Sequence, residues 1–257
     1  MSFAAAIAFV FAISGCSSKS SNTTGEEQPA AATTAKKTVD MSTVGSISGV
    51  VKLEGAAPKF RPINMSADPY CVKANHGHPV YPDEVVTGPG NSLANVVVYI
   101  KSGLEDYSFP TPSESVTLDQ KDCMYTPHVV ALMVGQQIKV INSDQTTHNI
   151  HPTPTDNRQW NKSQPPGAPP ILETFARPEI AIPVKCNVHP WMKGYIAVMS
   201  NPYYAVTGKD GQFDLKNVPP GTYTIEAWQE KYGTQDQTIT ITSKQEKTGV
   251  DFTFKAQ

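Results

Sequence analysis

The sequence lacks an excess of charge of either sign, and it lacks a long apolar run. Its 257 residues include 21 Lys and Arg against 23 Asp and Glu, which gives a formal net charge of -2. Without a surplus of basic residues, the chain has no electrostatic footprint for DNA or RNA. No apolar run reaches the roughly 18 residues that a membrane-spanning helix needs. We therefore expect neither a nucleic-acid-binding protein nor an integral membrane protein.

Apolar residues with helical spacing are also scarce. The chain is instead rich in turn formers, with 22 Pro and 17 Gly. Its apolar residues alternate with polar ones or form short runs that end at turns. This pattern predicts strands at residues 47–53, 96–100, 129–133, 138–141, 180–184, 195–199, 222–228, 237–242 and 250–254. The fold class that follows is all-β, and a helical bundle is disfavoured.

Cysteine is rare, with four in the chain: Cys16, Cys71, Cys123 and Cys186. Cys16 follows an apolar stretch, Ala4 to Ile13, and the small pair Ser14-Gly15. This order resembles the lipobox of bacterial lipoproteins, in which the cysteine is acylated, although residues 1–15 contain no Lys or Arg. The resemblance implies that residues 1–16 are a lipoprotein signal peptide and that Cys16 is lipidated.

Residues 17–43 are rich in Ser, Thr, Ala, Lys and Glu and contain no aromatic residue. Such a segment cannot bury enough apolar surface to order itself, so we expect a disordered tether. The lipoprotein resemblance implies an extracytoplasmic, lipid-anchored protein in the periplasm. Because Ser17 stands where an Asp marks retention in the inner membrane, the resemblance favours the outer membrane.

The last part of the chain contains two closely spaced turn pairs. Asp210-Gly211 is followed by Phe213, and Pro220-Gly221 is followed by Tyr223. These residues resemble the last half of the carboxypeptidase regulatory-like domain, a transthyretin-type β-sandwich.

Two segments far upstream, at residues 49–51 and 95–99, resemble the first half of the same domain. We therefore expect a nested arrangement. Residues 44–104 and 203–257 would form the two parts of a carboxypeptidase regulatory-like sandwich, and residues 105–202 would form a domain inserted between them.

The inserted segment contains a cluster of soft metal ligands. Cys186, His189 and Met192 follow one another with C-x2-H-x2-M spacing, and His148-Asn149 lies about forty residues upstream. A thiolate, two imidazoles and a thioether suit copper, and two His and one Cys with a weak axial Met form a blue-copper site. Zinc would accept the Cys and the two His, but the thioether disfavours it.

Residues 116–200 resemble the cupredoxin family, in particular its amicyanin-like and plastocyanin-like members. The resemblance rests on Asn142-Ser143-Asp144, on His148-Asn149 and on the Cys186 to Met192 loop. It implies a Greek-key cupredoxin sandwich over residues 105–202. It also implies a mononuclear Cu(I)/Cu(II) site with His148, Cys186 and His189 as equatorial ligands and Met192 as the axial one. Asn149 would hold the two ligand loops together by hydrogen bonds near the cysteine sulfur.

The remaining histidines leave alternatives. His151 competes with His148, but residues three apart on a strand point to opposite faces, so only one of them can face the metal. Asn149 and the cupredoxin resemblance favour His148. His76 and His78 lie in a Gly/Pro-rich loop and are expected on the surface, whereas His128 has no assignment.

Apart from Cys16, three cysteines remain, and any two of them could form a disulfide. Cys71 and Cys123 lie outside the ligand motif, and an oxidising compartment favours their pairing. We therefore expect a disulfide between Cys71 and Cys123, which leaves Cys186 as a free thiolate.

The cupredoxin resemblance implies a single-electron carrier rather than an enzyme, because an axial Met leaves no open position for a substrate. The edge of the His189 imidazole would then reach the surface, and a redox partner protein would dock near His189, Pro190 and Trp191. Two alternatives remain: a copper carrier or storage protein, and a surface binding or scaffold module with a vestigial copper site.

Overall fold

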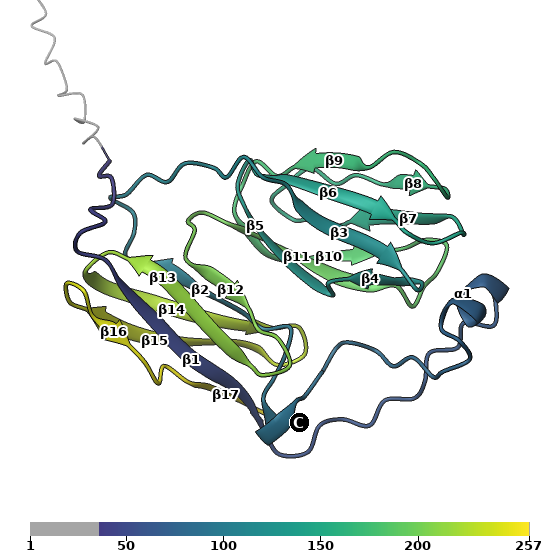
Figure 1. Cartoon of the computed structure of the whole chain (residues 1–257), viewed down its shortest axis with the longest axis horizontal. Helices are drawn as coiled ribbons and strands as arrows, with labels where there is room; N and C mark the ends of the chain where they lie inside the picture. Colours follow the sequence, from purple (N-terminus) through teal and green to yellow (C-terminus); the bar gives the residue numbers. More distant parts are fainter. Residues whose placement is uncertain (1–35, 257) are drawn as a thin grey trace, which may run out of the picture. The chain divides into compact units, whose positions relative to one another are not determined.

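The structure is a computed structural model, and it describes residues 36–256. The predicted signal peptide with Cys16, and the tether as far as residue 35, lie outside the described residues. The described part consists of four β-sheets, one six-residue α-helix and one short 3-10 helix (Figure 1). The prediction of an all-β fold is confirmed. No helix within residues 36–256 has the length and apolar character to cross a membrane.

The first sandwich consists of two four-stranded sheets. One has the order β13-β1-β16 with β17 also paired to β1, and its strands are β1 (Gly45–Glu54), β13 (Gln212–Val218), β16 (Glu246–Lys247) and β17 (Phe252–Lys255). The other has the order β12-β2-β14-β15, and its strands are β12 (Tyr204–Val206), β2 (Val97–Ser102), β14 (Gly221–Gln229) and β15 (Gly233–Ile241). This sandwich is therefore built from strands that precede and follow the rest of the fold.

The alternating sequence of β1 explains its place in this sandwich. Ile47, Val51 and Leu53 are at most 2% exposed, and they pack in one core with Phe213 and Phe252. Side chains of a strand point alternately to opposite faces, so one face of β1 is covered while the other is more open.

The turn before β13 depends on Gly211. Its φ of +67° lies in the left-handed region, and a Cβ there would lie 2.4 Å from the Val51 carbonyl oxygen. Glycine is therefore required for β1 and this turn to approach each other closely.

The second sandwich lies between β2 and β12 in the sequence. Its five-stranded sheet has the order β5-β11-β10-β7-β8, with β5 (Val129–Met133), β11 (Lys193–Met199), β10 (Glu179–Lys185), β7 (His148–Pro152) and β8 (Lys162–Gln164). Its four-stranded sheet has the order β4-β3-β6-β9, with β4 (Met124–Thr126), β3 (Val116–Lys121), β6 (Gln137–Asn142) and β9 (Ile171–Thr174). Their apolar faces enclose a core that includes Leu118, Ile150 and Ile196.

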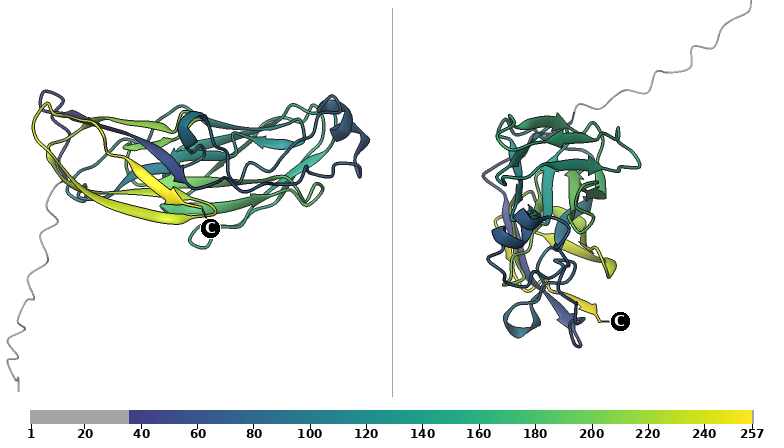
Figure 2. Two further views of the ribbon diagram at one scale, coloured as in Figure 1. Left: turned by 90° about the horizontal axis from the view of Figure 1, so that it is seen from below. Right: turned by 90° about the vertical axis from the view of Figure 1, so that its right-hand side faces the viewer.

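A long excursion between β1 and β2 reaches the second sandwich. It contains α1 (Pro69–Ala74) and the 3-10 helix η1 (Pro89–Asn91). Although this range was expected in the first sandwich, Met65 and Cys71 belong to the core of the second sandwich. Figures 1 and 2 show α1 at the end of the second sandwich, away from β1 and β2. The excursion brings a piece of distant sequence to the loops that carry the predicted ligands.

Candidate metal centre

The loop between β10 and β11 gathers three of the predicted ligands. Cys186 follows β10, and its backbone N–H donates to the Met192 carbonyl oxygen at 3.2 Å. The Met192 N–H in turn donates to the His189 carbonyl oxygen at 2.9 Å, and the His189 N–H donates to Cys186 Sγ at 3.3 Å. These bonds close a tight turn, so Cys186, His189 and Met192 are held in a fixed relation by backbone geometry.

Strand β7 brings His148 to the same place. It pairs antiparallel with β10, with Lys185 opposite His151, so the residues at the start of β7 lie beside the loop after β10. The Asn149 N–H donates to Cys186 Sγ at 3.5 Å, and its Oδ1 accepts a hydrogen bond from the Asn187 N–H. Asn149 thus joins the two ligand-bearing segments at the cysteine sulfur.

The side chains of His148, Cys186 and His189 converge. One ligand atom from each lies within 4.8 Å of the other two. The two histidine Nδ1 atoms are 2.9 Å apart, and His189 Nδ1 is 4.0 Å from Cys186 Sγ. All three residues are at most 3% exposed, and Met192 is fully buried. Two imidazole nitrogens and the Cys186 sulfur converge in this buried pocket, and together with the buried thioether of Met192 they are a donor set that fits copper.

Each of the two imidazoles has a carboxylate on its other nitrogen. His148 Nε2 lies 2.8 Å from Asp144 Oδ2, and His189 Nε2 lies 3.0 Å from Asp68 Oδ2. Each carboxylate accepts the Nε2 proton of its imidazole, so the Nδ1 of each ring is directed toward the other ring and the sulfur. This is the usual second contact of metal-binding histidines, and it fixes the ring orientation.

Sequence reasoning did not assign these two carboxylates. Asp144 belongs to the Asn142-Ser143-Asp144 segment used for the resemblance, so its proximity to His148 could have been inferred from a spacing of four residues. Asp68 lies 121 residues from His189, and no pattern in the sequence connects the two.

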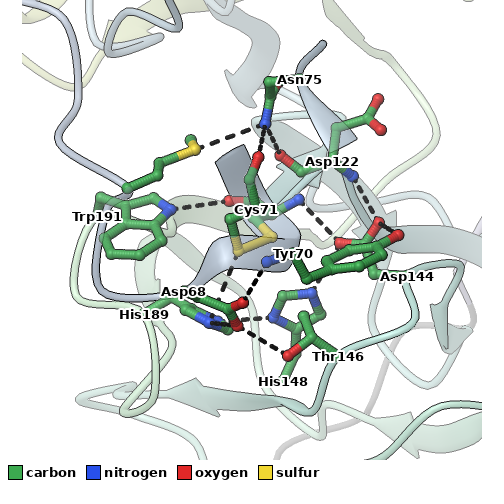
Figure 3. Close-up of a disulfide and its surroundings, with 12 residues drawn as sticks. Asp68, Tyr70, Cys71, Asn75, Asp122, Asp144, Thr146, His148, His189 and Trp191 are labelled. Carbon is green, nitrogen blue, oxygen red and sulfur yellow. Dashed lines mark hydrogen bonds and ion pairs between the residues drawn. A yellow bond between two sulfur atoms is a disulfide. The ribbon is translucent and has the colours of Figure 1, made fainter. Parts of the chain in front are cut away.

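Asp68 is placed by α1, whose first turn it caps. Its Oδ1 accepts the Tyr70 N–H at 2.8 Å, while Oδ2 also accepts from Thr146 Oγ1 at 2.8 Å. The same turn is also attached covalently, because Cys71 forms a disulfide with Cys123. Figure 3 shows α1 and this disulfide lying directly against His189 and His148.

The pKa values of Cys186 and His148 are shifted in opposite directions by the contacts that these residues make. Burial alone would raise the pKa of Cys186, but hydrogen bonds with His148 and with the N–H groups of Asn149 and His189 hold it below its ordinary value. Burial would lower the pKa of His148, yet Asp144 and Cys186 hold it above its ordinary value. The pocket therefore favours a thiolate and compensates its charge with a cation.

The exposed imidazole edge expected for His189 is not present. His189 is only 2% exposed, with Asp68 at its Nε2 and Cys71 Sγ 3.8 Å from the same atom. Pro190 is exposed and Trp191 is half-buried. The Trp191 ring centroid lies 5.0 Å from that of His189, and its indole N–H donates to the Cys123 carbonyl oxygen at 3.1 Å.

The other histidines lie apart from this cluster. His151 is held by Asn187 Oδ1 at 3.2 Å and by Gln159 Nε2 at 2.6 Å. His76 and His78 are exposed beyond the end of α1. His128, which had no assignment, pairs with Glu230 of the first sandwich, with 2.5 Å between Nε2 and Oε1.

Comparison with known proteins gives one family match. Residues 196–255 match the carboxypeptidase regulatory-like domain. No curated protein matches the chain.

Solved structures resemble the chain at low overall similarity. A Cu-containing nitrite reductase from Thermus scotoductus SA-01 is 20% identical with a TM-score of 0.31, over 37% of this chain and 24% of that chain, so the match spans about a quarter of the reductase. The P94A mutant of amicyanin is 21% identical with a TM-score of 0.30, over 33% of this chain and 82% of that chain. A purple cupredoxin from Nitrosopumilus maritimus is 18% identical with a TM-score of 0.28, over 33% and 99% of the two chains. Residues 196–255 are thus similar to a carboxypeptidase regulatory-like domain, and amicyanin and a purple cupredoxin are among the solved structures that resemble the chain.

Proposed function

We propose that this chain is a blue-copper protein that carries single electrons outside the cytoplasm. His148, Cys186 and His189 would hold the copper, and Met192 would be its fourth, weaker ligand. The observation that carries the proposal is the convergence of three ligand atoms within 4.8 Å in a buried pocket, with the second nitrogen of each imidazole on a carboxylate.

The residues of the site suit electron transfer because they are held from several sides. Copper, when bound, supplies a one-electron couple between Cu(I) and Cu(II). Backbone hydrogen bonds fix the Cys186 to Met192 loop, and β7 fixes His148. A site that is held in one geometry needs little rearrangement when its charge changes by one. Asn149 and the His189 N–H stabilise the thiolate by donating to its sulfur.

The same arrangement argues for a carrier and against an enzyme. Four protein ligands leave no coordination position for a substrate, and α1 covers the His189 side of the pocket. In this proposal a redox partner protein docks near His189, Pro190 and Trp191. Since His189 itself is covered, the electron would pass through Trp191, whose ring lies 5.0 Å from that of His189 and is partly exposed.

Location outside the cytoplasm is part of the proposal. The disulfide between Cys71 and Cys123 fits an oxidising compartment. Together with the lipobox-like sequence at Cys16, it supports a lipid-anchored protein facing the periplasm, with the outer membrane favoured.

The test is a visible absorption spectrum of the purified chain after addition of Cu(II). We expect an intense thiolate-to-copper band that is lost in Cys186→Ala, because Cys186 supplies the thiolate of the site. His151→Ala is the matched control on β7 and should keep the band. A colourless wild-type protein would refute the proposal.

The burial of His189 favours one alternative, a copper carrier or storage protein. His189 is 2% exposed, whereas a partner that receives electrons needs a short path to the metal. Cyclic voltammetry distinguishes the two functions. Reversible oxidation and reduction with copper retained supports the electron carrier, and loss of copper in one oxidation state supports the copper carrier.

A further inference from the structure

Asp68 makes more contacts with the candidate metal centre than a helix cap requires. Its Oδ1 caps α1 through the Tyr70 N–H, and its Oδ2 accepts from both Thr146 Oγ1 and His189 Nε2. All three contacts of this carboxylate are made by donors, and such contacts favour its ionised form.

The helix that carries Asp68 is fixed at several points. The Cys71–Cys123 disulfide joins α1 to the turn before β4. At the C-terminal end of the helix, Asn75 Nδ2 donates to the Asp122 carbonyl oxygen at 2.9 Å. Tyr70 OH donates to Asp144 Oδ1 at 3.2 Å, so the helix also contacts the carboxylate that binds His148 (Figure 3). α1 thus touches the carboxylate partners of both histidines.

Two physical consequences follow for His189. A fixed acceptor at Nε2 keeps the proton on that nitrogen and leaves Nδ1 as the metal-binding atom. A negative charge one imidazole away from the metal position also favours the more positive oxidation state. The effect is screened little, because His189 is 2% exposed and Asp68 is 20% exposed.

We propose that Asp68 is a positioning residue for His189 and that its charge lowers the reduction potential of the copper site. The proposal rests on the proposed copper function and assigns a role to the excursion between β1 and β2. The charge of Asp68 would make the Cu(II) state of the site more stable than the four ligands alone would make it.

The first experiment measures the reduction potential of the copper-loaded chain by cyclic voltammetry. Asp68→Asn removes the charge and keeps one oxygen, which can accept from His189 in the place of Oδ2, while the amide nitrogen takes the place of Oδ1 beside the Tyr70 N–H. We expect the Cu(I)/Cu(II) equilibrium to shift toward Cu(I) by about tenfold, which raises the potential by about 59 mV. The matched control is Asp122→Asn. Asp122 is exposed, its carboxylate points away from the histidines in Figure 3, and its φ of +53° is one that Asn tolerates.

The second experiment needs no metal. In ¹H–¹⁵N spectra of the metal-free chain, we expect a slowly exchanging proton on His189 Nε2, which Asp68→Asn retains. Asp68→Ser keeps a side chain that caps α1 but loses the reach to His189, and it should abolish this signal.

The outcomes separate the two proposals. A wild-type chain without a thiolate-to-copper band refutes the copper function. The metal-free spectra still test whether Asp68 fixes His189 through the Nε2 hydrogen bond. A normal band with the same potential in wild type and Asp68→Asn refutes the electrostatic role. An unchanged Nε2 proton signal in Asp68→Ser refutes the positioning role.

Discussion

The Cys71–Cys123 disulfide should contribute strongly to the stability of the second sandwich. It joins residues 52 apart in the sequence, and closing a loop of that length removes unfolded-chain entropy worth about 4 kcal/mol. The double variant Cys71→Ala/Cys123→Ala should therefore lower the free energy of unfolding by about that amount.

Urea denaturation of the metal-free chain measures this loss. The transition can be followed by tryptophan fluorescence, because Trp160 and Trp191 pack against the core of the second sandwich. A thiol reductant provides the control: it should bring the wild type to the midpoint of the double variant and leave the variant unchanged, since its remaining described cysteine, Cys186, is unpaired. A loss below about 1 kcal/mol would show that the loop is already constrained in the unfolded chain, which would refute the entropic argument.

Three further predictions concern the ligand set and the core. Met192→Gln should keep the copper band but lower the reduction potential, because a stronger axial donor stabilises Cu(II); an unchanged potential in voltammetry would remove Met192 from the ligands. His151→Ala should leave the copper band at its wild-type intensity, since His151 is held by Asn187 and Gln159, and a bleached protein would show that the wrong histidine was chosen. Phe252→Ala should cost roughly 3–5 kcal/mol in chemical denaturation, because Phe252 is 1% exposed and packs against Phe213. The matched Leu172→Ala, at a side chain 50% exposed, should cost far less, and equal losses would contradict the assigned core.

The strands could be predicted from sequence wherever an apolar run faces a core. The segment predicted at 129–133 coincides with β5, and that at 138–141 lies within β6 (Gln137–Asn142). The short strands β8 (Lys162–Gln164) and β9 (Ile171–Thr174) were not predicted. Residues of β8 and β9 are mostly half-buried or exposed, so they have too few core-facing side chains to produce a periodic pattern.

The candidate site divides in the same way between local and distant residues. Cys186, His189 and Met192 lie on one turn, so their spacing alone implies proximity. The contact of Asp68 with His189 could not be predicted, because it depends on a disulfide and on the excursion between β1 and β2. The Pro/Gly-rich flanks of that excursion show no periodic pattern of apolar residues. The expected exposure of His189 was wrong for the same reason. The cupredoxin resemblance covers residues 116–200 and contains no information about a helix from residues 69–74 that covers the site.

The nested order of strands determines when each part of the chain can fold. During synthesis or export from the N-terminus, β1 appears first, but its partner β13 arrives only after the whole second sandwich, because Gly45 pairs with Val218. Parts of a chain that are complete fold before parts that wait for distant partners. The second sandwich, complete at Met199, can therefore fold and form its disulfide while the first still has only β1 and β2. The ligand pocket and its covering helix would then be assembled before the sandwich into which they are inserted exists.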